Sequence, residues 1–242
     1  MRPTFCLLFL FIFTISYSSE IPDSSRTKLK AYGSVSLNTN GIASIPAFSL
    51  DKPAVIASVS LVKNRFSYDP TLGYGFDLRI WVIDNWLHYK LILRPAFELI
   101  AGFDASTFGN KNTLQGEPIR EAQRYFTYSI TGVYKFSQKE SLTVAYWNDR
   151  GQEKGTLKGH FFTITGERTD ICIGKNVLLS SALQLFYINY DGNNDGLFVS
   201  PKISSSIKNI PFSIFFQATQ ALTSNISPFP GFRWNLGISY TL

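Results

Sequence analysis

Apolar and polar side chains alternate along most of this chain, and the alternation is most regular in its last stretch, residues 231–242. One face of that stretch carries only apolar side chains, namely Phe232, Trp234, Leu236, Ile238, Tyr240 and Leu242. The opposite face carries polar or small residues, from Arg233 to Thr241. A period of two predicts a β-strand with one apolar side. Because that side stays apolar to the final residue, it must contact either a protein core or a lipid bilayer.

The same period recurs and predicts twelve strands in all. They are expected at residues 29–38, 54–62, 65–81, 86–93, 95–103, 121–136, 140–147, 156–166, 177–190, 196–207, 212–222 and 231–242. No stretch shows the 3.6-residue period of an amphipathic helix, and after the first residues no apolar run reaches transmembrane-helix length. The pattern therefore predicts an all-β chain, although it leaves open which faces of 156–166 and 177–190 are apolar.

The first residues have the pattern of a secretory signal peptide. Arg2 precedes an apolar segment from Leu7 to Ile15, and the small residues Ser16 and Ser18 follow it. That segment is too short to span a bilayer as a helix, which takes about 20 residues. We therefore expect residues 1–19 to be cleaved, residues 20–28 to form a flexible leader and residues 29–242 to form the folded domain.

Two architectures fit long alternating strands, a soluble sandwich and a membrane barrel, and three features favour the barrel. The strands are longer than the usual five or six residues of globular strands. The connections alternate between tight ones, such as Lys63-Asn64 and Arg94-Pro95, and longer ones, with exceptions at 82–85 and 167–176. Aromatic residues make up 15% of the chain and gather near strand ends, as two membrane interfaces would require.

The pattern over residues 29–242 resembles that of the bacterial outer-membrane β-barrel proteins, specifically the small monomeric twelve-stranded kind. In lipid every backbone polar group must be paired, and a sheet achieves this only by closing on itself. The C-terminal assembly signal of that family is matched by Gly237, Tyr240 and Leu242, with departures at Leu236, where a polar residue is usual, and at the terminal Leu242, where an aromatic is usual.

This resemblance implies a closed antiparallel up-and-down transmembrane β-barrel in the bacterial outer membrane, with both termini periplasmic. The partners that it implies are outer-membrane lipid and the barrel-assembly machinery, and it implies a monomer.

Charge and cysteine content exclude several classes of function. The formal net charge is +6, and without Arg2 there remain 22 Lys and Arg against 17 Asp and Glu. No basic run is long enough to indicate nucleic-acid binding. Cys6 leaves with the signal peptide and Cys172 then stands alone, which excludes an intramolecular disulfide and a cysteine metal cluster. No cofactor is expected.

Charged residues on the predicted inner face are the candidate lumen-lining residues. They are Arg79, His88, Lys90, Arg94, Glu98, Glu121, Lys202 and Arg233. Two interpretations stay open: structural ion pairs inside a narrow barrel, or the lining of a pore that passes small polar or anionic solutes. Arg233 is expected near the outer end of the lumen, facing Asp77 or Glu121.

Catalysis is not supported by the motifs. Outer-membrane phospholipases carry a Ser two residues after the catalytic His, whereas Phe162 follows His160 and Lys90 follows His88 at that spacing. We therefore predict a non-enzymatic barrel with a narrow passive pore or a surface or structural role. The alternatives are a lipid-acting outer-membrane enzyme and a secreted soluble β-barrel carrier.

Two loops complete the predictions. Asp191, Asn193 and Asp195 match the start of a calcium loop, but Lys202 stands where the bidentate Glu should be, so no metal site is expected. The connection from Asp104 to Arg120 is polar, and we expect it to be a mobile loop or a partial plug.

Overall fold

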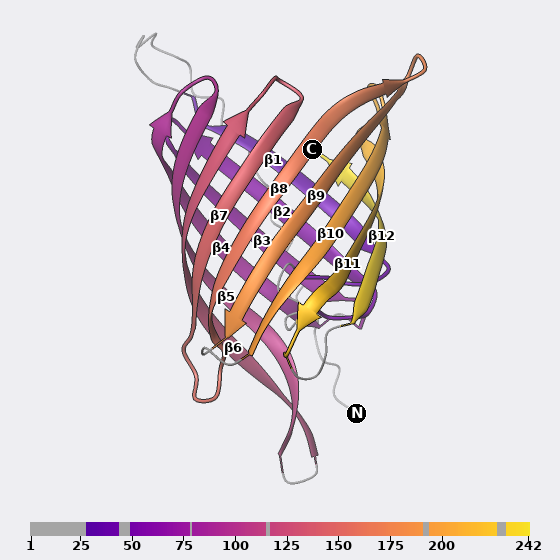
Figure 1. Ribbon diagram of the computed structural model, residues 1–242. Helices are drawn as coiled ribbons and strands as arrows, with labels where there is room; N and C mark the ends of the chain where they lie inside the picture. Colours follow the sequence, from indigo (N-terminus) through magenta and orange to yellow (C-terminus); the bar gives the residue numbers. More distant parts are fainter. Residues whose placement is uncertain (1–27, 44–48, 78, 115–116, 191–193, 227–230) are drawn as a thin grey trace, which may run out of the picture.

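The computed structural model describes residues 28–43, 49–77, 79–114, 117–190, 194–226 and 231–242, and these form one closed antiparallel barrel without helices (Figure 1). Its twelve described strands are β1 (Lys30–Asn38), β2 (Ala54–Lys63), β3 (Phe66–Gly75), β4 (Ile80–Leu93), β5 (Phe97–Leu114), β6 (Glu117–Lys135), β7 (Glu140–Gly151), β8 (Lys158–Ile173), β9 (Val177–Tyr190), β10 (Asn194–Ile207), β11 (Phe212–Ser224) and β12 (Phe232–Thr241). Each strand pairs with its neighbours in sequence, and β12 pairs with β1. The predicted fold class is confirmed. The predicted signal peptide and nearly all of the leader, residues 1–27, lie outside the described residues.

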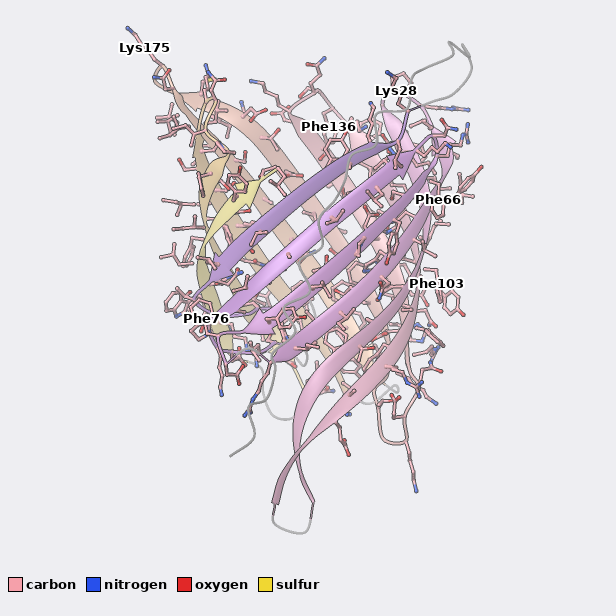
Figure 2. The ribbon with its side chains drawn as sticks, turned by 180° about the vertical axis from the view of Figure 1, so that it is seen from behind. Lys28, Phe66, Phe76, Phe103, Phe136 and Lys175 are labelled. Atoms are coloured by element: carbon pink, nitrogen blue, oxygen red, sulfur yellow. The ribbon has the colours of Figure 1, made fainter. Side chains whose placement is uncertain are left out.

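The barrel has two distinct ends, which we call the turn end and the loop end. The turn end carries the connections at 64–65, 94–96, 136–139, 174–176 and 208–211, and the loop end carries the other six. Figure 2 places Lys28, Phe136 and Lys175 at the turn end and Phe76 toward the loop end. Leu242 lies at the turn end too, because its backbone N–H donates to the carbonyl of Gly33.

The outer surface is apolar, as the alternation predicts. Phe232, Trp234, Leu236 and Ile238 of β12 are all exposed, as are Tyr128 and Ile130 of β6 and Ile214 and Phe216 of β11. The faces of β8 and β9 are now assigned: Phe162 and Leu183 point outward, whereas Phe161 and Phe186 are almost completely buried inside. A wall with this outer face needs an apolar solvent, which a lipid bilayer supplies.

Three predicted connections are wrong in position. The chain reverses between β3 and β4 at residues 76–79, where the amide of Gly75 donates to the carbonyl of Arg79, and not at 82–85. The apolar side chains of Tyr74, Phe76 and Ile80 continue the alternation through this reversal, so the period conceals it.

The link expected at 167–176 is mostly strand. β8 continues to Ile173, with a bulge between Arg168 and Ile171 in which Asp170 has a φ of 52°. A bulge inserts one extra residue and so interrupts the alternation. The real turn at 174–176 is short, like its neighbours at the turn end.

The segment from Asp104 to Arg120 is neither a loop nor a plug in the described residues. β5 and β6 pair across it, and between Phe108 and Tyr125 they pair only with each other. The two strands extend as a twisted hairpin beyond the loop end (Figure 1). Beyond the wall no lipid contact imposes a period of two, so the hydrophobic pattern did not indicate this hairpin.

The loop end of the interior is packed with apolar side chains. The rings of Trp147, Phe161, Phe186 and Phe198 form a row across β7 to β10, with successive centroids 4.9–5.3 Å apart. A second cluster is formed by Ala54, Trp81 and Val82, and Ala43 of the β1–β2 connection packs against both clusters. This connection therefore narrows the barrel from within.

Candidate functional site: the barrel lumen

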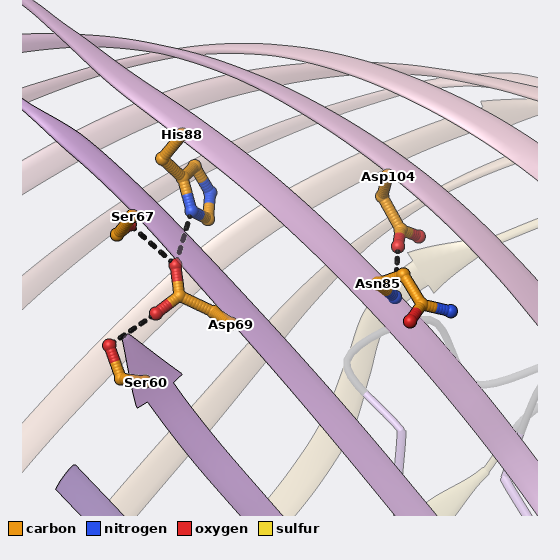
Figure 3. A network of polar contacts seen from close by, with 6 residues as sticks. All are labelled: Ser60, Ser67, Asp69, Asn85, His88 and Asp104. Atoms are coloured by element: carbon orange, nitrogen blue, oxygen red, sulfur yellow. Dashed lines mark hydrogen bonds and ion pairs between the residues drawn. The ribbon is translucent and has the colours of Figure 1, made fainter. Parts of the chain in front are cut away.

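A polar network crosses the inner face of β2, β3 and β4 (Figure 3). One carboxylate oxygen of Asp69 lies 2.8 Å from Nδ1 of His88 and accepts a 2.7 Å hydrogen bond from the hydroxyl of Ser67, while Ser60 donates to the other oxygen. The indole of Trp86 stacks parallel to the His88 ring at 5.2 Å. These contacts fix the imidazole in one orientation, because Asp69 holds one nitrogen and Trp86 covers a face.

Nearer the turn end, Glu98 forms ion pairs with two lysines. Its carboxylate is almost fully buried and lies 2.7 Å from the ammonium of Lys90, and Lys135 contacts the other oxygen. Pairing at both oxygens compensates the cost of removing the carboxylate from water. The inner charges at this level are therefore largely cancelled.

Lys202 lies on the inner face of β10 beside a small polar cavity. Its ammonium stands 5.0 Å from the ring centroid of Phe215, a cation–π arrangement. That ring lies directly over Gly237 of β12, where an added Cβ would come within 2.4 Å of it. Serine and amide side chains from β1, β10, β11 and β12 complete the cavity of about 320 Å³.

A second cavity, of about 300 Å³, lies near the loop end between the two apolar clusters. It is lined by three carboxylates, Asp84, Asp104 and Asp149, and by the aromatic side chains of Trp81, Trp86, Phe108 and Trp147. We call it the acidic–aromatic cavity. Asp104 accepts a 2.8 Å hydrogen bond from the backbone N–H of Asn85, and Asp149 accepts one of 2.8 Å from the hydroxyl of Thr127.

A β-bulge shapes this cavity. The register between β3 and β4 shifts at Gly73 and Tyr74, so that Trp81 and Val82 are both buried inside, although they are adjacent in sequence. Gly73 has no side chain to obstruct them, since a Cβ there would come within 2.6 Å of Val82 and 2.9 Å of Trp81.

Sequence reasoning did not assign these three carboxylates to a site. Asp84 and Asp149 fell within predicted connections, and Asp104 fell at the border of one. All three belong to strands, and the cavity residues come from seven separate segments of the chain. The sequence pattern that could have indicated the site is the two-residue spacing of Asp84, Trp86 and His88, which places them on one face of a strand.

Five of the eight candidate lumen residues lie on the inner face, namely His88, Lys90, Glu98, Lys202 and Arg233, and the other three do not. Arg79 lies in the 76–79 connection with its Nε 3.7 Å from Asp77, and Arg94 is exposed in a tight turn. Glu121 is exposed on β6, in the part of the hairpin that extends beyond the barrel wall. Arg79 was placed wrongly because the alternation continues past the end of β3, and Glu121 because the alternation does not mark where β6 leaves the barrel wall. Arg94 lies in the tight turn that the sequence predicted, where no inner face is defined.

Arg233 points to a different partner from the one predicted. Its Nε lies 3.0 Å from the carboxylate of Asp51 in the β1–β2 connection, and not beside Asp77 or Glu121. This contact ties the inward connection to β12. The adjacent Asn235 and Asn38 share a buried hydrogen bond of 2.8 Å across the same seam.

The residues of the predicted assembly signal lie at the turn end of that seam. Gly237 pairs with Asn38 and Tyr240 with Val35, and the side chain of Leu242 comes within 3.1 Å of the position that a Cβ on Gly33 would take.

Of the weak metal candidates, Asp191 and Asn193 lie outside the described residues. Asp195 is already engaged, since it accepts a 2.8 Å hydrogen bond from Tyr187. Among the described residues, no group of His, Cys, Asp or Glu side chains is arranged to hold a metal ion.

Comparison with known proteins gives a fold and no family. No protein-family model matches the sequence, and no curated protein matches it. The barrel is similar to the solved structure of the KdgM porin in complex with disordered oligogalacturonate, with a TM-score of 0.55 and 10% identity over 86% of this chain and 98% of that one. It is also similar to an outer membrane channel from Pseudomonas putida F1, with a TM-score of 0.52 and 12% identity over 92% of this chain and 99% of that one. At such identities the likeness establishes a shared architecture: this chain has the fold of outer-membrane β-barrels.

Proposed function

We propose that this protein is a narrow passive channel for small solutes in the bacterial outer membrane. The observation that carries the proposal is a closed barrel whose outer face is apolar and whose interior holds polar, charged cavities. Closure leaves no unpaired strand edge, as a lipid environment demands. The likeness to a porin and to a channel supports the same function.

The charges inside the barrel bear on the class of solute. A pore for anionic sugars, such as the oligogalacturonate in the KdgM complex, would need cations that remain available in the lumen. Here Lys90 and Lys135 share Glu98, Arg79 faces Asp77, and Arg233 faces Asp51. This pairing favours small polar solutes over anionic ones.

The test is single-channel recording. Protein folded in detergent, and shown to migrate faster on a gel without boiling than after it, is added to planar bilayers. Discrete conductance steps are expected, and boiled protein is the control. If the folded protein gives no steps, the channel proposal fails while the barrel stands.

We further propose that residues 1–19 are removed on export, that residues 20–28 are a leader, and that both termini lie in the periplasm. Cys172 offers a test, because it is exposed and lies next to the 174–176 turn at the turn end. A membrane-impermeant thiol reagent should leave Cys172 unmodified in intact cells and modify it after lysis. A Gln152→Cys variant, at the loop end, should react in intact cells. The reverse result would show that the barrel is inserted with the opposite orientation.

A further inference from the structure

The acidic–aromatic cavity has the composition of a site for an organic cation. Aromatic faces attract cations through their ring quadrupoles, and carboxylates attract them by charge. Three carboxylates and four aromatic side chains meet in this one cavity, and they come from β4, β5 and β7. The walls therefore provide attraction for the charge and apolar surface for the organic part of such an ion.

The carboxylates of this cavity have no basic partner among the described residues, unlike Glu98. No Lys or Arg forms an ion pair with Asp84, Asp104 or Asp149 within the part of the chain that the structure describes, and the hydrogen bonds to Asp104 and Asp149 come from a backbone amide and a hydroxyl. Arg150 follows Asp149 but belongs to the other face of β7 and bonds to Asn148 at 2.8 Å. A cation in the cavity would supply the missing charge.

An independent observation comes from Tyr190 on β9. Its hydroxyl is buried and is the one side-chain polar atom among the described residues that has neither solvent contact nor a hydrogen-bond partner. Buried polar groups are normally satisfied, so such an atom calls for a partner. Tyr190 pairs with Gly159 of β8, and Gly159 pairs with Asp149 of β7, so all three lie in one row across the wall.

Gly159, which has no side chain, leaves room for the Tyr190 ring to extend toward Asp149. A Cβ on Gly159 would stand 2.8 Å from the Tyr190 ring, which shows that the ring leans across β8 in the direction of β7. No hydrogen bond joins the Tyr190 hydroxyl to Asp149. A donor group placed between them would satisfy both.

We propose that the acidic–aromatic cavity binds small organic ammonium ions that carry N–H groups. The N–H groups donate to Asp84 and Asp149, and the carbon skeleton contacts Trp81, Trp86 and Trp147. An N–H group that extends past Asp149 along the same row reaches the Tyr190 hydroxyl. A bare metal ion does not fit this arrangement, because the described carboxylates are not grouped to coordinate one. The proposal deepens the proposed channel function, since it names the solutes that the loop end of the lumen selects.

The positions of the tryptophans allow a direct measurement. The chain has four tryptophans, and three of them line the cavity, whereas Trp234 faces outward. In a Trp234→Phe variant all tryptophan emission therefore comes from the cavity. The folded variant is titrated with benzylammonium, with neutral benzyl alcohol and with anionic benzoate, which share one ring and differ in charge. Benzylammonium should change the emission with saturation, and the other two should bind at least about tenfold more weakly, because neither carries the positive charge that the carboxylates attract.

Matched variants test the carboxylates. Asp84→Asn combined with Asp149→Asn preserves side-chain shape and should weaken benzylammonium binding by about tenfold or more. Glu98→Gln, which removes a carboxylate outside the cavity, should leave the binding unchanged. Equal binding of the three probes to the unaltered cavity would overturn the proposal, as would full affinity in the double variant.

The same protein separates this proposal from the channel proposal. Reversal potentials measured in a salt gradient should show preference for benzylammonium over benzoate, and the double variant should lose that preference. Conductance without selective binding would refute the cation site and leave the channel intact. Selective binding without conductance would refute the channel and leave the site intact.

Discussion

The two halves of the lumen differ in whether their interior carboxylates have partners of opposite charge. At the turn end Glu98 is enclosed by Lys90 and Lys135, and Asp69 is engaged by His88 and two serines. At the loop end Asp84, Asp104 and Asp149 share a cavity with tryptophans and have no described ion-pair partner. The turn half is thus internally compensated, whereas the loop half combines an apolar core with uncompensated acid. The proposed cation site therefore lies in the loop half.

The largest effect is expected where the two ends of β12 are compared. Leu242→Asp places a charge at the turn end of the seam, beside Gly33, and should abolish membrane assembly. Arg233→Ala, at the loop end of the same strand, removes the contact to Asp51 and should leave assembly intact. Assembly is measured by heat-modifiable gel mobility of membrane fractions, with Leu242→Phe as the conservative control. Normal assembly of the aspartate variant would refute the assembly role of this residue.

Apolar packing should contribute most to the free energy of unfolding in the loop half. Phe198 is completely buried and stacks on Phe186 at 4.9 Å, so Phe198→Ala should lower the free energy of unfolding by about 3–5 kcal/mol. Gln217→Ala alters a partly buried side chain on the inner face, beside the small polar cavity next to Lys202. We expect it to change stability by less than about 1 kcal/mol, because one side-chain hydrogen bond contributes little. Urea titration of both variants in lipid vesicles makes the comparison, and equal losses would mean that the loop-half cluster is not a core.

Removing the carboxylate that balances Lys90 and Lys135 in the turn half should change the ion selectivity of the pore more than its stability. In a Glu98→Gln variant, Lys90 and Lys135 lose their shared partner, and the lumen gains one net positive charge. The reversal potential in a salt gradient should move toward anion preference. A Glu140→Gln variant, which alters an ion pair with Arg168 that is more exposed, is the control and should leave the reversal potential unchanged. An unaltered potential in Glu98→Gln would show that these charges do not face the permeation path.

The smallest effect is expected in the β7–β8 connection at the loop end. The side chain of Arg124 donates a 2.6 Å hydrogen bond to Glu153, and this bond holds the pKa of the Glu153 carboxyl below its usual range. The contact is therefore complete above the ordinary glutamate pKa and is lost as the pH falls through the lowered pKa. A thiol label on a Gln152→Cys variant should become more mobile at acidic pH, and Glu153→Gln should remove that pH dependence. A mobility that is independent of pH in the parent would contradict this assignment.

Much of the wall was predictable from the sequence because one physical rule dominates it. Each strand must present apolar side chains to lipid, so the alternation in β6, β11 and β12 records both the strand and its outer face. The same rule does not cover segments that leave the membrane. The β5–β6 hairpin extends beyond the wall, and the reversal at 76–79 retains the alternation, so both were assigned wrongly.

The sequence by itself thus determined an all-β chain of alternating strands and the outer face of most of them, since lipid contact imposes a local period of two. Only the tertiary structure decided what fills the interior. Barrel closure and register bring Asp84, Asp104 and Asp149 together from three strands, and the bulge opposite Gly73 turns Trp81 toward them. These contacts join residues far apart in the chain, so no local pattern records them. The placement of Tyr190 across Gly159 likewise depends on register between strands, which is a property of the closed sheet.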